Sequence, residues 1–325
     1  MKDRSLVPML GLALAAALVA SFVYRGEVKP ERQREKVVAI FKTGSASNAF
    51  WSSVRDGVES GAQDYGLDLS IRAPRDEIYV DEQIEIMKGA IAERPAAIVL
   101  AACDYHRLVE SVREAKAAGI KVVCVDSFIE TEDADSKVGT DNFEAGQACG
   151  KALLRSLGKG SKVAVMSYVQ DSSTAIGRES GLRNALGDRA TVIGTSYSSS
   201  ETDKAYAQAK DILAKESSLR GIAALNLPTL LGAAAALDES GRSGSVVLVG
   251  VDGSAEVMRY IEHGIIRDAI VQKPFNMGYL SMATVRELLS GKRPERYTNT
   301  GSVDINKANM FEPENQKLLF PVDGN

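Results

Sequence analysis

One apolar pattern occurs twice along this 325-residue chain, and the repeat limits the possible folds more than any other feature. Val163 lies 126 positions after Val37, and Asp252 lies 126 positions after Asp126. Each of these residues stands in, or directly after, a short run of β-branched and aliphatic residues. A chain of this length exceeds the size at which one hydrophobic core usually stops growing. The repeat therefore predicts one α/β unit that is used twice, as two lobes.

Within each copy, short apolar runs alternate with segments whose apolar residues recur at helical spacing. The apolar runs are too continuous for strands with one solvent-exposed face, which indicates sheets that are covered by helices on both faces. Alternation of strand and helix is typical of parallel α/β layers. The predicted fold class is α/β, with two doubly wound parallel-sheet lobes. We expect strands at residues 37–41, 67–71, 97–101 and 120–125, and again at 162–166, 221–225 and 246–252.

A third, shorter block follows the second copy. It has apolar runs at 269–271 and 301–303, with a helical pattern from Met277 to Leu288 between them. Because the block is too short for a lobe of its own, we expect the chain to return to the first lobe and to finish near the second. The predicted first lobe is 37–140, completed by 273–301, and the predicted second lobe is 141–272, completed by 302–325.

The amino-terminal segment has the composition of an export sequence. Lys2 and Arg4 precede an uncharged apolar stretch from Leu6 to Tyr24, and a charged linker follows. This order of a basic start and an apolar stretch is typical of a secretory signal. The stretch is also just long enough to span a bilayer. Residues 1–36 are therefore predicted to be a cleaved export signal or a retained membrane anchor, plus a linker, which places the protein outside the cytoplasm.

The charge and motif content disfavours several classes of function. The net charge is −4 and no dense Lys/Arg block occurs, so nucleic-acid binding is not expected. The two histidines, His106 and His263, lie far apart and lack metal-ligand spacing. No G-x-G-x-x-G loop, P-loop or G-x-S-x-G elbow occurs. The serine run Ser198–Ser200 is expected to be a loop and helix cap. We expect a protein without enzymatic activity, cofactor or metal.

The three cysteines are Cys103, Cys124 and Cys149. Their odd number and the absence of a C-x-x-C pair argue against a disulfide framework or a metal knuckle. Two of them end apolar runs and the third lies on an apolar helix face, so we expect buried, inert thiols.

Ligands of parallel α/β sheets bind beyond the carboxyl ends of the strands, and two facing sheets would therefore form the walls of one cleft. Carboxylates there can accept hydrogen bonds from hydroxyl groups, while arginine and amide side chains donate them. Aromatic rings offer a flat surface for the C–H face of a sugar. The candidate ligand-binding residues at these strand ends are Lys42, Asn48, Phe50, Trp51, Asp126, Arg178, Asn226, Asp252 and Gln272.

Structural alternatives remain open for several of these residues. Phe50 or Trp51 could anchor a helix in the core, and Arg178 could be a surface charge on a helix. Asp126 and Asp252 could be turn residues at the ends of strands. The recurrence of an aspartate at the same place in both copies favours a shared role in binding, with one carboxylate on each wall.

Several motifs, in order along the chain, resemble those of a known family. They are Asn48-Ala49-Phe50-Trp51, Asp56-Gly57, Thr140-Asp141-Asn142, Ala145-Gly146, Arg178-Glu179-Ser180-Gly181, Val249-Gly250-Val251-Asp252-Gly253, Gln272-Lys273-Pro274 and Met277-Gly278-Tyr279. With these motifs, the segment from Lys36 to about Met310 resembles periplasmic sugar-binding proteins of the ribose-binding type. The resemblance implies the type I periplasmic binding protein fold, in which a three-strand hinge joins the lobes near 140–141, 272–273 and 301. It also implies ligand-contacting positions for all of the candidates named above except Lys42.

The resemblance predicts a monomeric protein that captures a small sugar or sugar-like polyol and delivers it to the permease of an ABC importer. The alternative is a membrane-tethered sensor subunit that presents its ligand to a kinase or chemoreceptor. An enzyme on the same architecture is a further alternative, for which no nucleophile or cofactor loop is found. Lys42, Ser127 and Ser200 depart from the ribose-binding pattern, which leaves the identity of the sugar open.

Overall fold

The computed structural model describes residues 34–45 and 49–319, and the chain forms one compact unit from Lys36 onward. The predicted export signal or anchor falls largely on residues 1–33, which lie outside the described residues. Among the residues that are described, no helix is long and apolar enough to cross a membrane.

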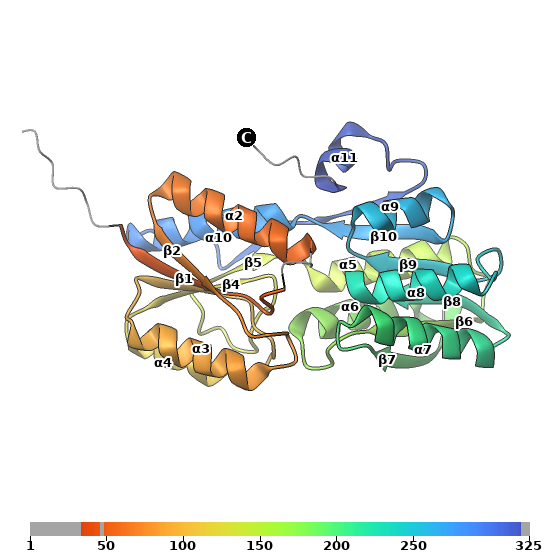
Figure 1. The fold of residues 1–325 in the computed structure, drawn as a ribbon, viewed down its shortest axis with the longest axis horizontal. Coiled ribbons are helices and arrows are strands. Elements are labelled where there is room, and N and C mark those ends of the chain that lie inside the picture. The colour runs from red at the N-terminus through yellow and green to blue at the C-terminus, as the bar shows by residue number, and fades with distance from the viewer. Residues whose placement is uncertain (1–33, 46–48, 320–325) are drawn as a thin grey trace, which may run out of the picture. The chain divides into compact units, whose positions relative to one another are not determined.

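The first sheet, sheet A, has six strands, and every neighbouring pair in it is parallel. Its central strands are the predicted apolar runs, moved by at most one residue at either end, and they are buried on both faces. Together with its helices, sheet A forms the N-lobe (Figure 1). The spatial order of the strands is β11 (Tyr297–Asn299), β5 (Ser136–Gly139), β4 (Lys121–Val125), β3 (Ala97–Leu100), β1 (Lys36–Ile40) and β2 (Asp68–Arg72).

The second sheet, sheet B, repeats this order and forms the C-lobe with its helices. Five of its strands are parallel, but the edge strand β12 pairs antiparallel with β10. The spatial order is β12 (Ser302–Asn306), β10 (Ile266–Gln272), β9 (Val247–Val251), β8 (Leu219–Ala224), β6 (Ser161–Ser167) and β7 (Ala190–Tyr197).

The reversed direction of β12 has a simple geometric cause. Only Thr300 and Gly301 separate the end of β11 in sheet A from the start of β12 in sheet B. The carboxyl ends of the two sheets line the same pocket and therefore face each other. A strand that leaves sheet A at its carboxyl end and continues forward must enter sheet B at that sheet's carboxyl end, which makes it antiparallel to its neighbour.

Helices cover both faces of each sheet, as Figure 1 shows for both lobes. In sheet A, alternate residues of β1 point into two apolar clusters: one includes α2 and α10, and the other includes α3 and α4. In sheet B, α5 and α6 cover one face, and α7, α8 and α9 cover the other. The helices are α2 (Ala49–Tyr65), α3 (Val80–Ala92), α4 (Val109–Ala117), α5 (Asn142–Leu154), α6 (Ser173–Leu186), α7 (Thr202–Lys215), α8 (Leu227–Glu239), α9 (Ala255–Glu262), α10 (Pro274–Leu289) and α11 (Pro313–Leu319).

The chain passes between the two sheets three times, between β5 and α5, between β10 and α10, and between β11 and β12. The predicted fold class of two doubly wound parallel-sheet lobes is confirmed, with β12 as the antiparallel exception. The three cysteines are buried and unpaired, as expected. Burial raises the pKa of each thiol to about 12, so none is a thiolate at neutral pH.

Candidate ligand-binding site

A cleft lies where the carboxyl ends of the two sheets face each other, and it encloses about 390 Å³ of space that is partly open to solvent. Eight of the nine residues predicted from the sequence line it, while Asn48 lies outside the described residues. The lining residues are Lys42, Phe50, Trp51, Glu77, Asp126, Tyr168, Thr174, Arg178, Ser200, Asn226, Leu227, Pro228, Asp252 and Gln272.

Two aromatic rings at the start of α2 form the apolar wall of the cleft. Phe50 and Trp51 pack edge to face, with ring centroids 5.2 Å apart, and Trp51 also lies 5.5 Å from Phe41. Trp51 belongs to the core cluster under α2 and is buried, whereas Phe50 is only partly buried. Trp51 therefore combines the two alternatives that the sequence left open, because it anchors the helix and also lines the cleft.

Asp126 and Asp252 end the buried strands β4 and β9 in the same unusual backbone conformation. Their φ angles are +59° and +81°, in the left-handed region that non-glycine residues rarely adopt. Aspartate is among the side chains that tolerate this region best. The repeat seen in the sequence therefore extends to the backbone at the site, with one carboxylate from each lobe on the cleft wall.

The two carboxylates differ in their protein partners. Asp252 accepts hydrogen bonds from the backbone N–H of Leu227 at 3.0 Å and from Gln272 Nε2 at 2.6 Å. Asp126 accepts one from Ser127 Oγ at 2.7 Å. Burial raises the pKa of Asp126 above its ordinary value, although Lys42 and Arg178 oppose this shift. Asp126 thus keeps more of its capacity to accept bonds from a ligand than Asp252 does.

Gln272 contributes an unsatisfied acceptor. Because its Nε2 donates to Asp252, the orientation of the amide is fixed, and Oε1 is buried without a hydrogen-bond partner in the described part of the chain. Buried polar atoms are nearly always paired, so an orphaned acceptor on a cleft wall suits a donor from a ligand.

Arg178 lies in the C-lobe wall, as Asp252 and Gln272 do, and is 3% exposed, which contradicts its reading as a surface charge. Its Nε donates to Asn142 Oδ1 and its Nη1 to the carbonyl oxygen of Leu225, both at 2.8 Å. No hydrogen bond joins Nη2 to another described residue. The guanidinium also lies 5.8 Å from the ring centroid of Tyr168. The group is therefore held rigidly, with one donor end available to a ligand.

Both polar atoms of the Asn226 side chain bond to other protein groups, which the sequence did not indicate. Its Oδ1 caps α8 by accepting from the N–H of Thr229 at 3.1 Å, and its Nδ2 donates to Ser200 Oγ at 2.9 Å. The residue lines the cleft, but its first role is to fix the start of α8.

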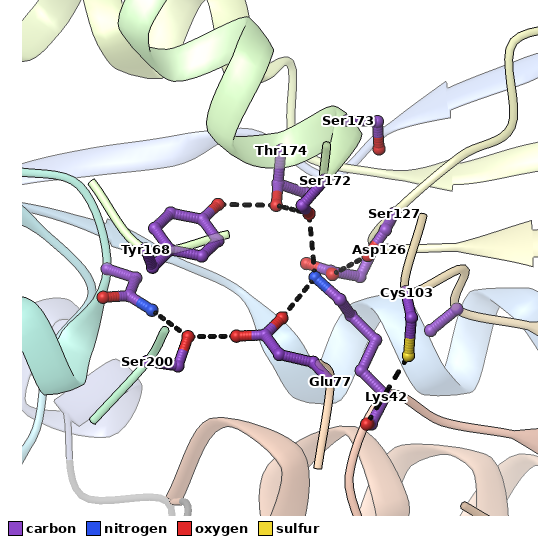
Figure 2. A network of polar contacts seen from close by, with 12 residues as sticks. Lys42, Glu77, Cys103, Asp126, Ser127, Tyr168, Ser172, Ser173, Thr174 and Ser200 are labelled. Atoms are coloured by element: carbon purple, nitrogen blue, oxygen red, sulfur yellow. Dashed lines mark hydrogen bonds and ion pairs between the residues drawn. The ribbon is translucent and has the colours of Figure 1, made fainter. Parts of the chain in front are cut away.

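Lys42 follows β1 and is 2% exposed. Its ammonium group pairs with Glu77 Oε2 at 2.7 Å and donates to Ser172 Oγ at 2.9 Å, as Figure 2 shows. Burial by itself would lower the pKa of Lys42, but the charge of Glu77, with Tyr168 and Asp126, raises it above its ordinary value. Lys42 is therefore a charged, buried part of the cleft wall.

Sequence reasoning missed Glu77, Thr174 and the role of Ser200. Glu77 lies in the loop after β2, and the strand-end argument would have found that loop if it had been applied to the second strand. The expectation that Ser198–Ser200 caps a helix is wrong. Glu201 is the N-cap of α7, no side chain caps that helix, and Ser200 donates to Glu77 instead.

The arrangement offers hydrogen-bond donors and acceptors on both walls around a flat aromatic surface. Among the described residues, no cluster of three or more His, Cys, Asp or Glu side chains could hold a metal ion. The geometry suits the reversible binding of a small polyhydroxylated molecule.

Comparison with known proteins agrees with this geometry. The sequence profile of a family described as periplasmic binding protein domain matches residues 39–293. A D-ribose/D-allose-binding protein of Pseudomonas aeruginosa is 26% identical over 292 residues, which cover 87% of this chain and 91% of that protein. A D-apiose import binding protein of Paraburkholderia graminis is 29% identical over 296 residues, which cover 90% of this chain and 89% of that protein.

Solved structures show the same similarity. An ABC transporter solute binding protein from Agrobacterium vitis, with bound D-fucose, is 30% identical and superposes with a TM-score of 0.84 over 87% of this chain and 99% of that one. A sugar transporter from Clostridium phytofermentans is 33% identical, with a TM-score of 0.77 over 85% of this chain and 100% of that one.

Proposed function

Since the chain belongs to the periplasmic binding protein family, we propose that it captures a small sugar or sugar-like polyol and delivers it to an ABC importer. The observation that carries this proposal is the cleft itself. Carboxylates, an arginine, amides and two aromatic rings, recruited from both lobes, line one cavity. Such a set satisfies both the donor and the acceptor side of each hydroxyl group and offers a surface for the ring.

The size of the cavity supports a small ligand. The whole space between the walls is about 390 Å³ even with the part that is open to solvent, so the enclosed cavity is smaller than that. We therefore propose a monosaccharide or a polyol of similar size, bound without turnover.

The role in import is supported by the names of the relatives reported above, which are import, transporter and sugar-binding proteins. Family membership also supports a location outside the cytoplasm. We propose a monomer that docks on a membrane permease. The relatives reported above give no support to the alternative of a membrane-tethered sensor, so the importer is preferred.

A thermal-shift screen tests the proposal. The panel contains D-ribose, D-allose, D-apiose, D-fucose, D-arabinose, D-galactose and simple polyols, with amino acids and nucleotides as controls. A ligand that binds only the folded chain, at a hundredfold excess over its Kd, stabilises it by about 2.7 kcal/mol. We expect at least one sugar or polyol to raise the melting temperature. A panel in which only amino acids or nucleotides do so would contradict the proposed ligand class.

A further inference from the structure

The ion pair between Lys42 and Glu77 is a feature of the cleft that ligand capture does not by itself explain. The two residues come from different loops of the N-lobe, Lys42 after β1 and Glu77 between β2 and α3. Their charged atoms are 2.7 Å apart, and their side chains are 3% and 9% exposed. Both line the cavity. A charged pair at this depth loses most of its hydration and needs further hydrogen bonds to remain stable.

Serine hydroxyls of the opposite lobe supply those bonds. Lys42 Nζ donates to Ser172 Oγ, which precedes α6, and Glu77 Oε1 accepts from Ser200 Oγ, which precedes α7. Figure 2 shows Ser172 at the ammonium group of Lys42 and Ser200 beside the carboxylate of Glu77. The ring of Tyr168 lies 5.9 Å from the ammonium group. The pair is therefore fully enclosed when the lobes meet, and its charges are held in fixed positions.

The pair also decides the balance of charge around the cavity. The lining contains two cationic side chains, Lys42 and Arg178, and three carboxylates, Glu77, Asp126 and Asp252. Without Glu77, the lining would carry two cations and two aspartates, and Lys42 would lack the carboxylate that contacts it, so an acidic ligand would no longer be repelled and could pair with the ammonium group. With Glu77 in contact, its carboxylate directly neutralises the ammonium charge of Lys42. The remaining balance, one guanidinium against two aspartates, repels an anion.

We propose that Glu77 is a specificity-determining residue, which holds and neutralises Lys42 so that the cleft accepts uncharged sugars and rejects sugar acids. The inference rests on the proposed function, because it concerns the ligand class of the same cleft. Glu77 acts here through Lys42, as a positioning and neutralising group, and the sequence motifs of the cleft do not include it.

The first test replaces Glu77 by glutamine, which keeps the size and an acceptor for Ser200 but removes the charge. Affinities are measured by calorimetry for matched pairs that keep the ring and differ by one carboxylate, D-galactose with D-galacturonate and D-glucose with D-glucuronate. The wild type is expected to bind a neutral sugar at least tenfold more tightly than its acid. Glu77→Gln is expected to improve the affinity for the acid at least tenfold.

A matched control removes the same charge elsewhere. Glu85 lies on the exposed side of α3 and pairs with Lys88 at 2.8 Å, so Glu85→Gln also breaks a Lys–Glu pair and changes the net charge by the same amount. It is expected to leave the ratio of neutral to acidic affinities at the wild-type value. An equal gain of acid binding in both variants would show that total charge decides selectivity and would overturn the inference.

A reciprocal variant keeps the inference testable if Glu77→Gln folds poorly. Lys42→Met leaves the Glu77 carboxylate unbalanced, so this variant is expected to gain affinity for D-galactosamine by at least tenfold over the wild type. If both variants fold and neither gains binding of the oppositely charged sugar, the inference is wrong. If the wild type binds neutral and acidic sugars equally well, only the inference fails. If it binds no sugar, the proposed function fails.

Discussion

At the scale of single residues, Asp126 and Asp252 hold equivalent places in the two lobes but make different bonds. Asp252 accepts from Leu227 and Gln272, so it stabilises both the start of α8 and the amide on the cleft wall. Asp126 accepts only from the adjacent Ser127 among the described residues. The shared role expected from the repeat therefore applies to their position and backbone, while the stabilisation of the fold falls mainly to Asp252.

Substitution by asparagine should separate these roles, because asparagine also tolerates the left-handed backbone. Asp126→Asn is expected to leave the melting temperature without ligand unchanged or higher, since it removes a buried charge. A hydrogen bond to a charged group contributes about 1.5–3 kcal/mol, so its affinity should fall about tenfold or more. Asp252→Asn is expected to lower both the melting temperature without ligand and the affinity, because it places an amide where two donors converge. Thermal melting and calorimetry check both variants, and equal effects would contradict the assigned difference.

Residue types at strand ends were enough to predict most of this cleft. Asp126, Asp252 and Gln272 follow apolar runs, and the topology of parallel sheets brings such positions together. The contact between Glu77 and Ser200 could not be predicted, because it joins loops from different lobes, 123 positions apart in the sequence. No local pattern in either loop marks the other as its partner.

At the scale of elements, glycines set how closely pairs of helices approach. A Cβ atom added to Gly57 of α2 would clash with the carbonyl oxygen of Phe275, and one on Gly278 of α10 would clash with that of Val54. In the C-lobe, Gly146 of α5 and Gly181 of α6 lie in the same way against the backbone of the other helix. Both lobes thus have close helix crossings in which a glycine lies against the backbone of the other helix, and these crossings account for Gly57, Gly146, Gly181 and Gly278 of the sequence motifs.

Gly181→Ala tests whether this crossing positions the site. The new methyl group would meet the backbone of Phe143 and Gln147, so α6 must move away from α5. Arg178 lies one turn earlier on α6 and bonds to Asn142 at the start of α5. We expect a loss of about 1–3 kcal/mol of stability, the usual scale for overpacking, and a tenfold or greater loss of affinity.

The control is Gly89→Ala in α3, because a Cβ atom at Gly89 would meet nothing within 4 Å. Alanine favours a helix over glycine by about 1 kcal/mol, so this variant is expected to be equally or more stable and to bind normally. Urea denaturation and calorimetry measure both variants. Normal binding by Gly181→Ala would show that the crossing supports the fold without positioning Arg178.

The elements that the sequence did not predict are the weakly patterned ones. β5 has four residues and β11 has three, too few for a periodicity to be visible. β7 lies at the edge of sheet B, and only Ala190 of its eight residues is buried, so it lacks the apolar run that marks the central strands. The direction of β12 depends on how the two sheets face each other, which is a property of the assembled fold.

At the scale of the whole folded unit, one short segment of the C-lobe, Asp171–Ser173, bonds directly to the N-lobe, in addition to the contact between Ser200 and Glu77. The N–H of Tyr105 donates to the carbonyl oxygen of Asp171 at 2.8 Å, and that of Phe128 donates to Ser173 Oγ at 2.9 Å. Between them, Ser172 accepts from Lys42. Three strand-end loops of the N-lobe thus hold one loop of the C-lobe, and these bonds involve no ligand atom.

We expect the lobes to open and close at the three crossings of the chain, and direct bonds of this kind would then supply part of the free energy of closure. They can be weakened without altering the cleft lining. Ser173 does not line the cavity, so Ser173→Ala removes an interlobe bond and leaves the ligand contacts intact. A net hydrogen bond contributes about 0.5–1.5 kcal/mol, and apparent affinity falls with the fraction of closed, competent molecules. We expect a two- to tenfold weaker affinity and, by small-angle scattering without sugar, a larger radius of gyration than the wild type, with both proteins reaching the same value at saturation. Ser161→Ala, whose hydroxyl bonds within its own lobe to Gly158, serves as the control and should match the wild type. An unchanged radius of gyration together with an unchanged affinity in Ser173→Ala would show that closure depends on ligand contacts alone.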